Sequence, residues 1–206
     1  MKFSDIDFSA LSNMMNSMSK EEKEKLNDMA ENVMNSMQKN NEETEENEDF
    51  YSFLHIKEEE YQNLPGIVLD QMEAASDLEQ YYEEIEDADF SGSILFYAKA
   101  ILNLLRENHF DVYKKVLDLK NLKDKTMTTL YDFYVPLMNE DNLHILMDAG
   151  YGASEDWIAH RNLIQQMYIM LNRAQFDTIH YNELQLMKEK LLNENGILRI
   201  VTMLKK

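Results

Sequence analysis

The sequence predicts an all-α protein, built as a multi-helix bundle of about seven to nine helices with a separate N-terminal helical hairpin. Apolar residues recur over most of the chain at the spacing of one helix face. Only 5 Gly and 2 Pro occur in 206 residues, whereas a sheet-rich fold needs many more turn residues to reverse direction. A hydrophobic content of 44% is enough for a buried core, so we expect a folded chain.

Residues 1–38 are predicted to form a Met-rich amphipathic helical hairpin. Met15 and Met18 lie on the apolar face of a first helix, and Met29 and Met37 lie on that of a second. Methionine adapts its unbranched side chain to varied surfaces, so the two faces could form a groove for a partner helix or peptide. Docking of the hairpin on the rest of the chain, or a dimer seam, explains the same pattern, because two short helices are marginal in isolation.

Residues 39–49 are strongly acidic and contain no apolar side chain, which is the composition of a flexible linker. The helical body would then occupy residues 50–206. The formal net charge of −19 comes from residues 1–90, because residues 91–206 carry equal numbers of acidic and basic side chains. The body therefore has an acidic N-terminal part and a charge-neutral C-terminal part. Such an acidic surface repels phosphates, so we expect no direct binding of nucleic acid or membrane.

The first part of the body is divided by a break at Pro65 and Gly66. Before it, residues 50–56 have the composition of a short strand or a helix, and we expect a helix. Residues 91–93, Ser-Gly-Ser, should end one helix and begin an apolar one over residues 94–105. Between the two breaks, helical spacing predicts a long acidic helix whose inner face carries Leu69, Met72, Leu78, Tyr82 and Ile85.

Cap and stop residues predict the remaining helices. Pro136 should end or kink a helix, Asn139 and Ser154 should each cap one, and Gly196 should stop another. The tail at residues 197–204 could be helix or strand. The predicted helices are residues 111–119, Thr126 to about Pro136, Asn139 to a stop at Gly150, a long one from Ser154, and one through Leu184, Met187 and Leu191.

Glu79, Glu83, Glu86 and Asp87 are predicted to form a row of carboxylates on the acidic helix. Such a row could hold a basic protein partner, or it could imitate a phosphate backbone in the basic groove of a nucleic-acid-binding protein. A solvated face that only keeps the protein in solution would carry the same residues.

Motifs for catalysis or cofactor binding are missing from the sequence. There is no Cys, which excludes disulfides and thiolate chemistry. His-Glu-x-x-His, a phosphate loop with its Lys, and a serine nucleophile elbow do not occur. We therefore expect no cofactor, no metal site and no enzymatic activity. No apolar run approaches the length of a membrane span, so we expect a cytoplasmic location.

These features favour a non-catalytic protein-binding function. The chain would be an adaptor, chaperone-like or regulatory protein that holds a partner protein through the Met-rich hairpin or the acidic helical face. The partner would be basic or would present an apolar helix, and the chain could form a homodimer. The main alternative is an acidic nucleic-acid mimic that inhibits a DNA- or RNA-binding protein, such as a phage or mobile-element anti-defence protein. An enzyme of unknown type is a second alternative.

Overall fold

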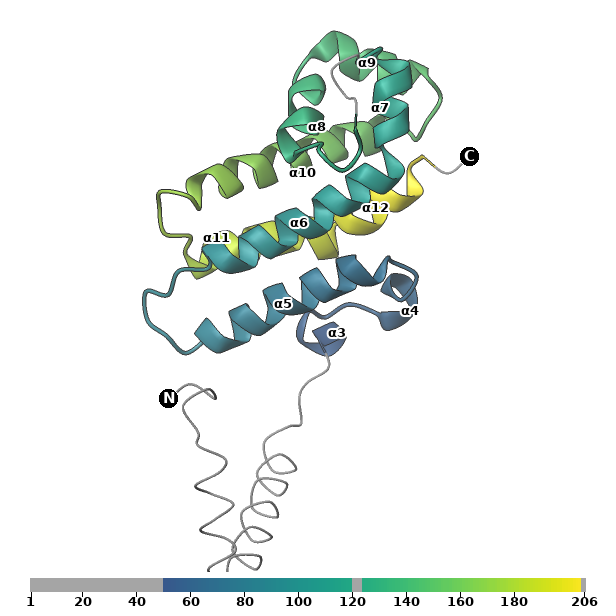
Figure 1. Cartoon of the computed structure of the whole chain (residues 1–206). Coiled ribbons are helices and arrows are strands. Elements are labelled where there is room, and N and C mark those ends of the chain that lie inside the picture. Colours follow the sequence, from purple (N-terminus) through teal and green to yellow (C-terminus); the bar gives the residue numbers. More distant parts are fainter. Residues whose placement is uncertain (1–49, 120–123, 205–206) are drawn as a thin grey trace, which may run out of the picture. The chain divides into compact units, whose positions relative to one another are not determined.

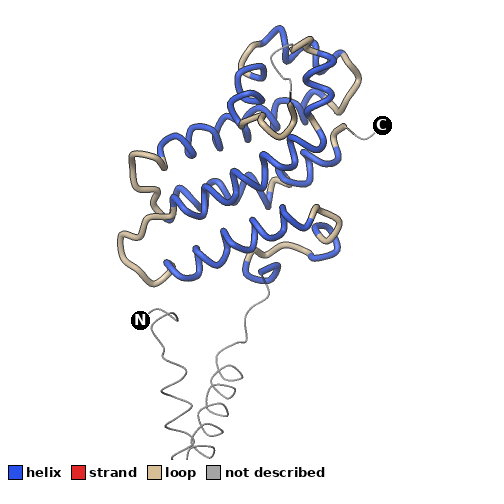
Figure 2. Tube along the Cα trace, in the orientation of Figure 1, coloured by secondary structure: helices blue, strands red, loops and turns tan. Residues whose placement is uncertain are grey.

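All regular elements in the described part of the chain are helices (Figure 2). The computed structural model describes residues 50–119 and 124–204. The packing of these helices into a multi-helix bundle confirms the all-α prediction. The predicted hairpin at residues 1–38 and the predicted linker at residues 39–49 lie outside the described residues.

Helix α6 (Ser91–Asn108) is the central helix of the bundle (Figure 1). It packs against α5 (Gly66–Tyr82), α10 (Ser154–Arg173) and α12 (Gly196–Thr202). A helix covered on several sides must be apolar on more than one face. The buried residues of α6 meet this requirement: Ser93, Ile94, Tyr97, Ala98, Ala100, Ile101, Leu104 and Leu105.

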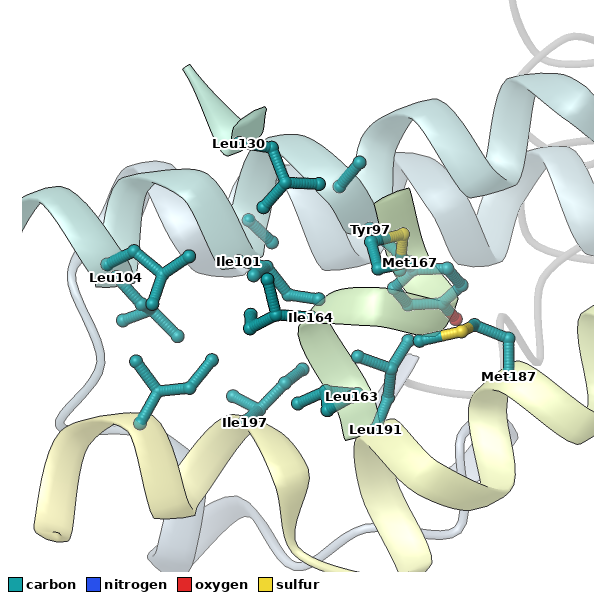
Figure 3. Close-up of a cluster of buried hydrophobic side chains, with 14 of the residues drawn as sticks. Tyr97, Ile101, Leu104, Leu130, Leu163, Ile164, Met167, Met187, Leu191 and Ile197 are labelled. Atoms are coloured by element: carbon teal, nitrogen blue, oxygen red, sulfur yellow. The ribbon is translucent and has the colours of Figure 1, made fainter. Parts of the chain in front are cut away.

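The core lies where α6 and α10 meet the C-terminal helices. Ile101 of α6 and Ile164 of α10 lie in the middle of this cluster, and both are fully buried (Figure 3). Met187 and Ile197 close it from the C-terminal part of the chain. Burying one aliphatic side chain of this size contributes about 1.5–3 kcal/mol, so the cluster stabilises the packing of four helices at once.

Two short helices precede α5. They are α3 (Phe50–Phe53) and α4 (Glu58–Tyr61), so residues 50–56 begin as a helix, as predicted, rather than as a strand. His55 has a φ of 54°, and a left-handed residue cannot continue a right-handed helix, so α3 makes a single turn. Pro65 directly precedes the first residue of α5, which confirms the predicted break.

Helices α7 (Phe110–Val116) and α8 (Leu130–Leu137) follow α6. The predicted start of α8 at Thr126 was wrong by four residues. The Asp132 carboxylate accepts the backbone N–H of Thr129 at 2.8 Å and its hydroxyl at 2.7 Å, and this cap fixes the start at Leu130. The helix ends one residue after Pro136, as expected from the missing N–H of proline.

Helix α9 (Glu140–Asp148) begins and ends as predicted. The side-chain oxygen of Asn139 accepts the backbone N–H of Asn142 at 3.1 Å, which satisfies one of the free donors of the first turn. Gly150 has a φ of 74°, and its N–H donates to the carbonyl of Met147 at 3.3 Å. Glycine adopts this left-handed conformation without strain, which is why it stops the helix.

The N-cap of α10 is Ala153, and the prediction that Ser154 caps this helix was wrong by one residue. The capping acceptor is instead a side chain in the first turn of the helix. The Asp156 carboxylate reaches back and accepts the N–H of Ala153 at 3.3 Å. An acid in the first turn also interacts favourably with the helix dipole, so Asp156 replaces the hydroxyl cap.

The C-terminal segment forms α11 (Tyr181–Lys188), a π-helical turn η2 (Glu189–Asn193) and α12. Gly196 was predicted to stop a helix, but it is the first residue of α12, so the prediction was wrong. Asn195 supplies the left-handed turn, with a φ of 56°. The tail at residues 197–204 is therefore mostly helical rather than extended.

Candidate functional site

Two connections meet at one end of the bundle. Residues 83–90 join α5 to α6, and residues 174–180 join α10 to α11 (Figure 1). The N–H of Phe90 donates to the carbonyl of Ile179 at 2.9 Å, and the N–H of Ile179 donates to the Asp89 carboxylate at 3.0 Å. These two hydrogen bonds join segments that are far apart in the sequence.

A cavity of about 380 Å³ opens where these connections meet. Two of its lining side chains, Glu83 and Asp87, are exposed carboxylates. None of the described residues that line the cavity is Lys or Arg, and His180 is the one histidine among them. The lining residues are Glu83, Ile85, Asp87, Ala88, Phe90, His180, Tyr181 and Asn182.

Aromatic rings form the apolar floor of the cavity. The rings of Phe90 and Tyr181 lie with their centroids 5.5 Å apart, and the Tyr82 ring packs edge-on against Phe90 with centroids 6.1 Å apart. Phe90 is buried, whereas Tyr181 is 46% exposed and presents its ring to solvent. Burial, together with the negative charges of Glu79 and Glu83, raises the pKa of Tyr181, so its hydroxyl keeps its proton and can donate.

The helical row of carboxylates that the sequence predicted is not formed. Helix α5 ends at Tyr82, so Glu83 is its C-cap, and Glu86 and Asp87 lie in the following loop. Asp87 has a φ of 59°, which no helix interior allows. Acidic side chains at a helix C-terminus oppose the helix dipole, which is a physical reason for the early end.

Glu79 is buried, so the prediction that it lies with the other carboxylates on an exposed acidic face was wrong. The residue is only 1% exposed. One carboxylate oxygen accepts hydrogen bonds from the Lys188 ammonium and the Gln185 amide, each at 2.7 Å. A carboxylate removed from water needs such a partner, and here the partner comes from α11. Glu79 therefore joins α5 to α11 within the body.

Asp89 is also acidic, but it is not among the residues that line the cavity. Burial raises the pKa of its carboxyl, but the hydrogen bonds from Ser91 and Ile179 outweigh that effect and lower it below the ordinary value. Its carboxylate is held by these hydrogen bonds, whereas Glu83 and Asp87 line the cavity as exposed carboxylates.

Six of the lining residues were not predicted from the sequence: Ile85, Ala88, Phe90, His180, Tyr181 and Asn182. Ile85 was predicted on the inner face of the acidic helix, but it is 47% exposed at the cavity. His180 and Tyr181 lie far along the chain, and no local pattern indicates that they meet residues 83–90. The methionines predicted to bind a partner, Met15, Met18, Met29 and Met37, lie outside the described residues.

A second polar cluster is sealed inside the body. His109 and His160 are both fully buried and contact Trp157 and Tyr113. Burial lowers the pKa of His109 to about 4. Burial, with the nearby charges of His109 and Arg199, lowers the pKa of His160 well below its ordinary value. Because no face of either ring reaches solvent, this cluster serves the core rather than a substrate.

The cavity offers both charge and apolar area to a ligand. It combines exposed carboxylates with an aromatic floor, and among the described residues no three His, Asp or Glu side chains gather as a metal site requires. None of the described helices is long and apolar enough to cross a membrane. In comparisons with known proteins, the chain matches no protein-family model, no curated protein and no solved structure.

Proposed function

We propose that this chain is a non-catalytic protein-binding protein that holds a basic segment of a partner protein at the cavity between residues 83–90 and α11. The observation that carries the proposal is the pairing of the exposed carboxylates of Glu83 and Asp87 with the apolar lining of the same cavity. A basic side chain with an aliphatic stem matches both features, because its stem contacts the rings while its head pairs with a carboxylate.

The energetics favour a mixed contact over a purely ionic one. An exposed ion pair contributes only about 0–1 kcal/mol, so two carboxylates alone cannot hold a partner firmly. Tyr181 and Ile85 add apolar area that a partner can cover, at about 25 cal/mol per Å². We therefore expect a partner segment that is basic and apolar together, and binding that weakens as salt screens the charges.

The experiment uses a short fluorescently labelled Lys/Leu peptide as the probe, with a Glu/Leu peptide of the same length as its control. Anisotropy measures the affinity of the full chain and of the double variant Glu83→Lys/Asp87→Lys. The matched control is Glu59→Lys/Glu73→Lys, which makes the same change of net charge at exposed sites away from the cavity. We expect the cavity variant to lose at least about tenfold in affinity, or about 1.4 kcal/mol, and the control to lose much less.

Equal losses in the two variants would contradict the proposal, because the probe would then sense only overall charge. A second comparison concerns the Met-rich hairpin predicted from the sequence. Replacing Met15, Met18, Met29 and Met37 with Gln should leave affinity for the Lys/Leu peptide unchanged if the cavity is the site. Loss of binding in that variant, with the cavity variant unaffected, would place the partner on the hairpin instead.

A further inference from the structure

Asp89 lies at the junction of the two connections that form the cavity. A single carboxylate oxygen, Oδ1, accepts three hydrogen bonds. Two come from Ser91, whose backbone N–H is 3.0 Å away and whose hydroxyl is 2.6 Å away. The third comes from the backbone N–H of Ile179 at 3.0 Å. One oxygen therefore fixes the start of α6 and the end of the α10–α11 connection together.

The neighbours of Asp89 and Ile179 are the walls of the cavity. Ala88 and Phe90 flank Asp89 on one side, and His180 and Tyr181 follow Ile179 on the other. Asp89 itself does not line the cavity. Among the described residues, one further hydrogen bond joins the two walls, from the Phe90 N–H to the Ile179 carbonyl at 2.9 Å, beside the ring contact of Phe90 with Tyr181.

We propose that Asp89 is the positioning residue of the partner site, and that it acts through the acceptor oxygen that joins the two segments. The expected effect on peptide binding rests on the proposed function, whereas the contact between the two walls can be measured independently of it. Removing the acceptor leaves the N–H of Ile179, a fully buried residue, without its partner. An unsatisfied buried donor is costly, so the two segments should separate to reach water.

The experiment compares Asp89→Ala and Asp89→Asn in the full chain. Both remove the same charge, but only asparagine keeps an oxygen in the place of Oδ1. The matched control is Glu84→Ala, which removes a charge from an exposed residue in the same loop that does not line the cavity. Amide hydrogen exchange of Ile179 and Phe90, followed by NMR, reports whether the walls stay joined. Affinity for the Lys/Leu peptide reports whether the site stays formed.

In Asp89→Ala we expect exchange at Ile179 to become at least about tenfold faster and peptide affinity to fall about tenfold. Glu84→Ala should stay near the wild type in both measurements. Asp89→Asn should be impaired much less than Asp89→Ala, because its amide oxygen still accepts these hydrogen bonds, although more weakly than a carboxylate. The inference is overturned if exchange at Ile179 is unchanged in Asp89→Ala, or if the asparagine variant is as impaired as the alanine variant.

If Asp89→Ala does not fold, Asp89→Glu takes its place, because it keeps the charge but moves the carboxylate by one methylene. That variant should show fast exchange at Ile179, and wild-type exchange would overturn the inference. Failure of the proposed function gives a different result. The wild type would then not bind the peptide at all, while the exchange rates of the variants would still decide the role of Asp89.

Discussion

The imidazole rings of His109 and His160 stack inside the core, with centroids 4.7 Å apart and planes inclined by 16°. The Nε2–H of His109 donates to the carbonyl of Ile200 at 2.8 Å, and Nε2 of His160 lies 3.4 Å from the Tyr113 hydroxyl. Among the described residues neither Nδ1 atom has a hydrogen-bond partner. Burial disfavours a positive charge on either ring, so the folded protein holds both rings neutral.

Acid should therefore destabilise the protein before its carboxylates titrate. The pKa of His109 falls from 6.5 to about 4 on folding, and that of His160 falls well below 6.5. Between pH 6.5 and about pH 4, the histidines of the unfolded chain bind protons that those of the folded chain exclude. The free energy of unfolding should thus fall as the pH drops below 6.5, by up to about 1.4 kcal/mol per pH unit for each histidine. Urea titrations across this range measure the slope.

His160→Phe keeps the volume of the ring but cannot be protonated, so its stability should depend less steeply on pH in the same window. The matched control is His144→Gln, whose side chain lies on the surface and should leave the wild-type slope unchanged. A stability that is flat between the two pKa values, or a slope that His160→Phe does not reduce, would contradict the assignment.

Removing the partner of the buried Glu79 carboxylate should lower the free energy of unfolding. Lys188 is 12% exposed and Glu79 is 2% exposed at the side chain, so Lys188→Met leaves an unpaired charge in the interior. We expect a loss of about 3 kcal/mol in the free energy of unfolding, measured by urea denaturation. Lys57→Met is the control, because the Lys57–Glu60 pair is exposed and should contribute about 0.5 kcal/mol or less. Similar losses in both variants would show that the buried pair has no special role.

A side chain at Gly196 should not fit. A Cβ built there would lie 2.9 Å from Cδ2 of Leu163 and would collide with the carbonyl oxygen of Lys190 in the π-helical turn. Gly196→Ala should therefore destabilise the protein by about 1–3 kcal/mol. Gly66→Ala is the matched control, because nothing lies within 4 Å of its Cβ. Thermal melting compares the two, and a tolerated Gly196→Ala would mean that the turn can shift without cost.

The local part of the fold follows from the sequence because its causes are local. Asn139 caps α9 and Gly150 ends it through hydrogen bonds within a few residues, so pattern and structure agree there. The N-cap of α10 was predicted one residue too late. The Ser154 hydroxyl and the Asp156 carboxylate are both capping groups within three residues, and the Asp156 carboxylate is the one that caps. Such competition changes a boundary by one residue without changing the helix.

The site was harder to predict because its contacts are long-range. Nothing near Glu79 in the sequence indicates that Lys188 will pair with it, so an acid on an acidic helix was interpreted as exposed. Ile85 was placed in the core because its spacing continues the helical face past Tyr82, where α5 ends. The acids that follow Tyr82 are unfavourable at a helix C-terminus, and that local signal could have predicted the loop.

The most direct measurement of where a basic partner binds is an NMR titration of the isotopically labelled full chain with the Lys/Leu peptide. The proposal predicts shifts concentrated at the amides of residues 83–90 and 180–182, which vanish in Glu83→Lys/Asp87→Lys. Shifts spread over other acidic residues, such as Glu58 and Glu73, would show diffuse charge attraction. That result, or the absence of any shift at the cavity, would contradict the cavity as the partner site.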